Sequence, residues 1–304
     1  MQLAPIVIFV YNRPWHTKQT IESLQKNLYA DESELFIFSD GPKNALDYER
    51  VKKVRTYLNS LNNFKKINIQ ESETNKGLAN SVIDGVSQVI GEYDRAIVLE
   101  DDLLSAPGFI KFMNEALKFY EENDQIFSIS GYSFPLDIPE EYKNDVYILP
   151  RASTWGWGSW KNRWQTFDWN LADFNEFIQN KTLQADFNKG GEDLTPMLKA
   201  QVYGYIDSWG IRWSYAHYKN KSFCLYPVKS KLNNIGADKS GTHTARTKKF
   251  EVTLDNQLSS LIFPKKLCLD KDIHTSMKRF LKLSIQRKII NYFRYAHLLN
   301  RKTK

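Results

Sequence analysis

The first hundred residues alternate regularly between short apolar runs and longer amphipathic runs, and this alternation limits the chain to few folds. The short runs are rich in β-branched and aromatic residues and predict strands, whereas the longer runs have apolar residues at helical spacing. Such an order is typical of an α/β protein in which helices cover both faces of a parallel sheet. The predicted strands are residues 5–11, 34–42, 65–72 and 96–99, and the predicted helices are residues 16–28, 47–61 and 77–90.

Beyond residue 105 the pattern is less regular. Five tryptophans lie in the glycine-punctuated stretch 153–169, which predicts a loop, and the polar segment 233–249 has no periodicity and predicts a mobile loop. The remaining predictions are a helix at residues 107–120, strands at 126–130, 145–150 and 222–227, and amphipathic stretches at 194–205 and 209–218.

The composition excludes several protein classes. With 304 residues, 42% of them hydrophobic, the chain has an ordinary globular composition, and its N-terminal apolar run is too short for a signal peptide or a membrane span. The two cysteines, Cys224 and Cys268, form no CxxC pair, which argues against a disulfide scaffold or a zinc site and favours a reducing compartment. We therefore expect a cytoplasmic protein.

The formal net charge of +7 is concentrated at the C-terminus. Residues 273–304 contain nine Lys or Arg and no Asp or Glu, so a globally basic nucleic-acid binder is not expected. Apolar residues recur in this tail at helical spacing, which predicts a basic amphipathic helix. Two interpretations remain open: the helix binds the inner face of a membrane, or it docks on the domain. The apolar positions are Leu281, Ile285, Ile289, Phe293 and Ala296.

Three adjacent carboxylates, Glu100, Asp101 and Asp102, directly follow the fourth predicted strand. At contact distance two like charges repel by about 1 kcal/mol in water and by roughly 4 kcal/mol at an effective dielectric constant near 20. A solvated turn could hold such a triplet, but ligands of parallel sheets bind at the carboxyl ends of the strands. Because Mn²⁺ and Mg²⁺ take carboxylate and phosphate oxygens, we expect either ion to bridge these acids to a diphosphate, as in nucleotide-sugar chemistry.

The other predicted strands also end in polar residues. Asn12 and Arg13 follow the first strand and could reach a base or a phosphate, and Asp40 follows the second as an acceptor for a uracil N–H or a ribose hydroxyl. Lys76 precedes a helix N-terminus, which suits an anion. A turn or a helix cap would explain each residue alone, but four polar strand ends at one sheet edge predict a nucleotide site.

The tryptophan-rich stretch has two interpretations. Its indole rings could pack in the core, or they could stack on sugar faces while the glycines allow the backbone to approach a ligand. For the second interpretation, Trp155 and Trp157 are the candidates for contact with the donor sugar or the acceptor.

The sequence resembles the GT-A glycosyltransferases in the motifs at residues 4–14, 39–42, 75–79 and 96–113. It is most similar to the N-acetylglucosaminyltransferase I group, whose metal motif is likewise Glu-Asp-Asp followed by a hydrophobic residue and Ala-Pro-x-Phe. The resemblance covers roughly residues 4–245. It implies a Rossmann-like, mostly parallel sheet flanked by helices, with Asp102 as the direct metal ligand and with Glu100 and Asp101 contacting the ribose and sugar of the donor.

The same resemblance implies roles for two residues in the second half. Asp207 matches the family's base, although Ser208 and Ile206 depart from the family pattern; the alternative is that Asp207 caps a helix. Residues 230–244 match a loop that orders over the nucleotide sugar and would bring His243 to the metal and the phosphates. A surface histidine is the alternative for His243.

Together these features predict a metal-dependent glycosyltransferase. We expect it to move a sugar from a UDP-linked donor, with N-acetylglucosamine suggested by the resemblance, to a hydroxyl of a glycan or glycolipid; inversion rests on the resemblance alone. A nucleotidyltransferase lacks support because no glycine-rich phosphate loop lies near the N-terminus, and a non-enzymatic membrane or nucleic-acid binder would leave the acids unexplained. The expected domains are residues 1–265 (nucleotide half 1–105, acceptor half 106–265) and a helical tail, 266–304.

Overall fold

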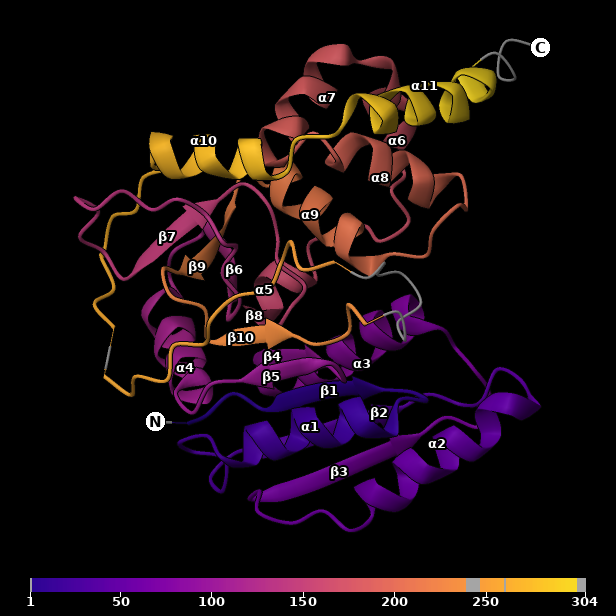
Figure 1. The fold of residues 1–304 in the computed structure, drawn as a ribbon, viewed down its shortest axis with the longest axis vertical. Coiled ribbons are helices and arrows are strands. Elements are labelled where there is room, and N and C mark those ends of the chain that lie inside the picture. The colour runs from indigo at the N-terminus through magenta and orange to yellow at the C-terminus, as the bar shows by residue number, and fades with distance from the viewer. Residues whose placement is uncertain (1, 239–246, 260, 300–304) are drawn as a thin grey trace.

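A large α/β sheet with helices on both faces forms the centre of the chain in this computed structural model, which describes residues 2–238, 247–259 and 261–299 (Figure 1). This arrangement confirms the predicted fold class. The strands of the large sheet are β1 (Ile6–Val10), β2 (Glu34–Ser39), β3 (Lys66–Glu71), β4 (Arg95–Glu100), β6 (Ile126–Ser130), β7 (Val146–Leu149), β8 (Trp157–Trp160) and β9 (Phe223–Pro227); β5 (Leu103–Ser105) and β10 (Leu232–Asn234) form a small second sheet.

The strand order of the large sheet is β3-β2-β1-β4-β8-β6-β9-β7. The first four strands are mutually parallel, whereas β8 pairs antiparallel with both β4 and β6. The helices are α1 (Pro14–Gln25), α2 (Ala45–Leu58), α3 (Leu78–Tyr93), α4 (Phe109–Phe119), α5 (Lys161–Trp164), α6 (Phe174–Gln179), α7 (Lys181–Phe187), α8 (Leu194–Val202), α9 (Trp209–Lys219), α10 (Lys271–Phe280) and α11 (Ile285–Leu299), with one 3-10 turn at Asn188–Gly190.

Two apolar layers sandwich β1, whose residues alternate between them as the period of a strand requires. Ile8 packs with the cluster under α1, α2 and α4, whereas Phe9 packs with the cluster under α3 and α9. Because both faces are covered, every residue of β1 is buried. Three apolar residues of the predicted helices are exposed: Leu28, Tyr48 and Phe119. Leu28 lies beyond the end of α1, Tyr48 lies in the first turn of α2, and Phe119 is the last residue of α4.

The tryptophan stretch forms a strand, so the predicted loop at residues 153–169 is wrong where β8 lies. Gly156, in the bend before β8, has a φ of 55°, and both glycines of this stretch allow close packing. A Cβ on Gly158 would lie 3.0 Å from the carbonyl oxygen of Ala96, and one on Gly156 would lie 1.8 Å from Cδ1 of Leu232. Since β8 is buried on both faces, it lacks the apolar–polar alternation that identifies a half-exposed strand.

The C-terminal segment packs on the sheet through its first helix. Asp270 caps α10 by accepting hydrogen bonds from the backbone N–H groups of Asp272 and Ile273, both at 3.0 Å. Ile273 and Met277 are buried beside Tyr147 and Tyr226. For α10, then, docking on the domain is what the structure shows, while the boundary predicted at residue 265 stays a prediction. Within the described chain, no helix combines the length and apolar character needed to cross a bilayer.

Candidate active site

The four polar strand ends meet as predicted. Because β1 to β4 are parallel and adjacent (Figure 1), their carboxyl ends lie at one edge of the sheet. Glu100 is the last residue of β4, and Arg13, Asp40 and Lys76 lie in the chain that follows β1, β2 and β3. This is the edge at which open α/β sheets bind their ligands.

The acid triplet at the end of β4 is compensated by an arginine. The Arg13 guanidinium donates a hydrogen bond to Asp101 and another, 2.9 Å long, to Oδ2 of Asp102. Burial and, after it, the charges of Asp102 and Asp101 together raise the pKa of Glu100 to about 8, against the opposing effect of Arg13. Burial also raises the pKa of Asp101, which Arg13 counteracts. One cation therefore balances only part of the negative charge that ionisation would place here.

A loop after β10 encloses Asp102. The backbone N–H of Ile235 donates to the Asp102 carbonyl at 2.9 Å, and Nδ2 of Asn234 lies 3.3 Å from Oδ1 of Asp102. A Cβ on Gly236 would lie only 2.0 Å from Oδ2 of Asp102, so the carboxylate needs a glycine at this position. Sequence reasoning missed Asn234 and Gly236, although the glycine in an otherwise polar loop was a usable signal.

Histidines near the acids are only partly described. His16, which was not predicted as a site residue, is buried with Nε2 3.2 Å from Oδ2 of Asp238. The histidine that was predicted, His243, lies outside the described residues.

The donor set suits a hard divalent cation that a substrate also holds. Oδ2 of Asp101 is buried, and among the described residues it has no hydrogen-bond partner. The described residues contain no group of three or more His, Cys, Asp or Glu arranged to hold a metal. One or two carboxylates, with the remaining positions left to phosphate oxygens and water, is how Mg²⁺ is commonly bound. The residues present therefore fit a metal that arrives with a diphosphate.

Asp40, which was predicted to contact the nucleotide, forms hydrogen bonds within the protein instead. Asp40 accepts four hydrogen bonds of 2.8–3.0 Å, from the backbone N–H groups of Gly41, Lys76 and Gly77 and from the side chain of Asn75. Both lone pairs of each oxygen are thereby used, which leaves none for a uracil N–H or a ribose hydroxyl, so Asp40 positions the loop before α3. Lys76 is exposed on that loop.

Asn12 is held by the start of α2. Its Nδ2 donates to Oδ1 of Asp47 at 2.6 Å, and the neighbouring Tyr11 hydroxyl donates to the other oxygen of Asp47 at 2.9 Å. Contact between Asn12 and a nucleotide stays a prediction.

A cavity of about 420 Å³ opens beside the acids. Glu100, Trp155 and Asp207 all line it, so the structure brings together residues from three distant parts of the chain. Oδ2 of Asp207 lies 3.7 Å from the position of a Cβ on Gly77, at the start of α3. Oδ1 of Asp207 lies 3.5 Å from the Arg212 guanidinium, and the Asp207 side chain is 57% exposed.

Asp207 does not cap a helix, contrary to the alternative interpretation. The N-cap of α9 is Ser208, whose Oγ accepts a hydrogen bond from the N–H of Ile211 at 3.3 Å. Asp207 therefore presents its carboxylate to the cavity.

The two candidate tryptophans have different environments. Trp155 is half-buried, packs edge-on against Tyr132 at 4.7 Å between ring centroids, and lines the cavity. Trp157 has 0% exposure and stacks on Trp164 in the core, so it cannot stack on a sugar. The prediction for Trp157 is wrong because the Trp157 side chain points from β8 into the apolar layer under α3 and α9.

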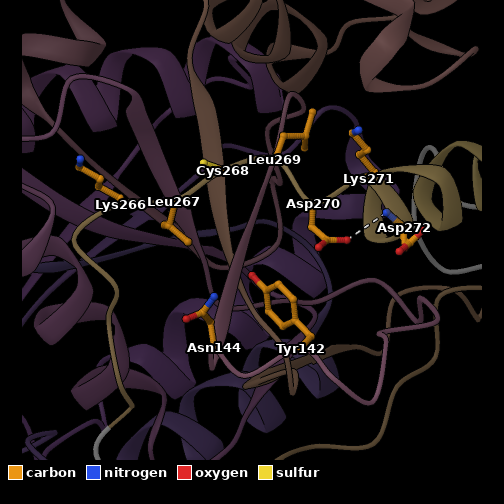
Figure 2. Close-up of a pocket in the computed structure, with 9 residues that line it drawn as sticks. All are labelled: Tyr142, Asn144, Lys266, Leu267, Cys268, Leu269, Asp270, Lys271 and Asp272. Atoms are coloured by element: carbon orange, nitrogen blue, oxygen red, sulfur yellow. Dashed lines mark hydrogen bonds between the residues drawn. The ribbon is translucent and has the colours of Figure 1, made fainter.

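A second cavity, of about 510 Å³, lies apart from the acids. Figure 2 shows its wall, formed by Tyr142, Asn144 and the connection leading into α10. The Asp270 carboxylate there is occupied by the N-terminus of α10. The cavity shares no residue with the strand-end site.

Comparison with known protein families assigns the chain to one of them. The family model described as glycosyl transferase family 2 matches residues 6–182, which is more than half of the sequence. The chain belongs to glycosyl transferase family 2. The match extends from β1 past β8 and includes the acid triplet, so this part of the chain is a glycosyltransferase domain. The finer resemblance to the N-acetylglucosaminyltransferase I group stays a prediction.

The chain is also similar to solved glycosyltransferase structures, and no curated protein matches it. Staphylococcus aureus TarS 1–349 matches with 13% identity and a TM-score of 0.42, over 75% of this chain and 59% of that one. The mannosyltransferase PcManGT from Pyrobaculum calidifontis, in complex with GDP-Man and Mn²⁺, matches with 11% identity and a TM-score of 0.39, over 55% and 47%. The chain thus spans less than two thirds of the length of either structure.

Proposed function

We propose that this protein transfers a sugar from a nucleotide diphosphate, UDP-linked, to a hydroxyl of a glycan or glycolipid. The observation that carries the proposal is the placement of the acid triplet at the carboxyl end of β4, beside a cavity that Asp207 and Trp155 also line. The donor sugar suggested by the resemblance is N-acetylglucosamine. Membership of the family leaves the two alternatives, a nucleotidyltransferase and a non-enzymatic binder, without support.

In this proposal the strand-end residues bind the donor diphosphate. Asp102, with Asp101 beside it, would hold Mn²⁺ or Mg²⁺. The buried Oδ2 of Asp101, which has no hydrogen-bond partner in the part of the chain that the structure describes, supports that assignment. The bound ion would neutralise charge on the leaving diphosphate. Arg13 stays within reach of the same carboxylates and adds positive charge near the phosphates.

Asp207 is the proposed base. Its exposed carboxylate would take the proton of the acceptor hydroxyl during in-line attack, while Arg212 keeps it oriented. Trp155 offers an aromatic face in the same cavity on which a sugar ring could stack. We expect a single displacement, which inverts the configuration at the anomeric carbon. This expectation rests on the family resemblance.

Thermal unfolding tests the donor half of the proposal. We expect UDP to raise the melting temperature of the full chain in the presence of Mn²⁺ and to have little effect without it, because the metal and the diphosphate share one site. Hydrolysis of a panel of nucleotide sugars then identifies the donor. A UDP shift that is absent, or that is the same with and without Mn²⁺, would contradict the proposal.

We also propose that the protein works at a membrane surface, on the cytoplasmic side. Ile285 and Ile289 of α11 are 77% and 50% exposed, in a tail that carries nine basic and no acidic residues from 273 onward. Exposed apolar residues with surrounding Lys and Arg favour an anionic lipid surface.

Vesicle flotation checks the membrane proposal. Replacing both isoleucines by serine should weaken binding to anionic vesicles at least ~10-fold, since each buried isoleucine contributes on the order of 1–2 kcal/mol. The matched control replaces Leu46 and Tyr48, which are 87% and 56% exposed on α2. Equal binding of both double variants would count against the membrane role.

A further inference from the structure

The cavity beside the acids has a wall that belongs to the C-terminal helix. Arg287, Asn291 and Arg294 of α11 line the same 420 Å³ space as Trp155 and Asp207. Asn291 is buried there, with 9% exposure. The helix that sequence analysis treated as a tail therefore completes the acceptor side of the site.

This wall is fixed to the domain by specific contacts. The backbone N–H of Leu283 donates to Oε2 of Glu192 at 3.1 Å, and the Lys288 ammonium lies 2.8 Å from the same carboxylate oxygen. The Arg294 guanidinium lies over the Tyr205 ring, 5.7 Å from its centroid. These contacts set which face of α11 points inward.

The inward face of α11 is polar and the outward face is apolar, the reverse of an ordinary surface helix. Arg287, Asn291 and Arg294 recur at helical spacing and line the cavity. On the roughly opposite side, at about 100° per residue, lie exposed apolar side chains. These are Ile285 (77% exposed), Ile289 (50%), Tyr292 (70%) and Phe293 (69%).

The acidic residues of the cavity face basic partners, whereas two of its arginines do not face acidic ones among the described residues. Of its acidic residues outside the strand-end triplet, Asp193 forms a two-bond ion pair with Arg151, both bonds at 2.8 Å, and Asp207 faces Arg212. Within the described residues, neither Arg287 nor Arg294 has a carboxylate within 4.0 Å. The two arginines are therefore available to an anion that enters the cavity.

We propose that the acceptor carries a phosphate group, which Arg287 and Arg294 hold while its hydroxyl faces Asp207. The inference rests on the proposed function. Guanidinium groups bind phosphate through paired hydrogen bonds, and two of them on successive turns of one helix suit its several oxygens. Since the opposite face of α11 is apolar and exposed, the phosphate can come from a lipid headgroup; a soluble phosphorylated glycan has the same chemistry.

Calorimetric titration of the full chain, with UDP and Mn²⁺ saturating so that the donor site is filled, tests the inference. The probes are octyl phosphate, glycerol 1-phosphate, octanoate and octyl glucoside. The double variant Arg287→Gln/Arg294→Gln should bind octyl phosphate at least ~10-fold more weakly than the wild type, because it loses two charge-assisted hydrogen-bonding groups. The matched control, Lys278→Gln/Lys282→Gln, removes two charges from the same segment outside the cavity lining and should bind as the wild type does.

Each outcome has a stated consequence. Octyl phosphate binding at least tenfold tighter than glycerol 1-phosphate supports a lipid-linked acceptor, whereas equal binding supports a soluble phosphorylated one. Octanoate or octyl glucoside binding as well as octyl phosphate, or equal losses in both double variants, would overturn the inference. If UDP fails to bind the wild type, the proposed function fails; the phosphate titrations, repeated without nucleotide, still decide the role of the two arginines.

Discussion

Asp102→Ala should abolish the Mn²⁺-dependent stabilisation by UDP. Asp102 is the acid whose carboxylate is enclosed by Asn234 and Gly236 and faces Arg13, and we propose that it holds the metal on the diphosphate. Loss of a metal-ligating carboxylate should weaken UDP binding in Mn²⁺ by about 100-fold or more, which titration of the melting temperature against UDP measures.

The variant should remain folded, because Arg13 keeps its ion pair with Asp101. Asp84→Ala is the matched control, since Asp84 is an exposed acid on α3 that does not line the cavity. A normal Mn²⁺-dependent shift in Asp102→Ala would show that the metal, if used, binds elsewhere.

Asp207→Asn should separate binding from transfer. The amide retains the shape of the side chain and can still face Arg212, but it cannot accept a proton at neutral pH. Loss of a positioned general base typically costs about 10²–10⁴-fold in rate, so we expect kcat to fall by that amount while UDP binding in Mn²⁺ is unchanged.

The measurement is the rate of sugar transfer or, with no acceptor present, of donor hydrolysis, beside the UDP-induced thermal shift. Asp84→Asn serves as the control. Normal turnover by Asp207→Asn would remove Asp207 from the mechanism, whereas loss of UDP binding as well would indicate a structural role at the start of α3.

Local pattern was sufficient to predict the nucleotide half of the fold. In β1 to β4 and α1 to α3, the apolar periodicity, the turn residues and the alternation of elements all favour the same structure, and the strand ends meet where a parallel sheet requires. The position of Asp102 followed from this alone, because an acid directly after a buried strand must lie at the carboxyl edge.

The remaining features depend on contacts between distant residues. Trp157 could not be told from a ligand-facing tryptophan, since its burial depends on α3 and α9, which cover that face of the sheet. Asp40 has the sequence context of a turn, but its four donors come from residues 41 and 75–77, which only the folded chain brings together. The sequence did not predict that Arg287 and Arg294 of α11 line the cavity, because a helical pattern does not indicate which face of the helix contacts the domain.

The contact of Arg13 with Asp101 and Asp102 has a consequence for the order of events. A divalent ion entering alone must compete for both carboxylates with a guanidinium that already contacts them. A donor diphosphate supplies further anionic oxygens, which can bind the ion and the guanidinium. We therefore expect free Mn²⁺ to bind weakly and to enter with the nucleotide sugar as one complex, so that each raises the apparent affinity of the other.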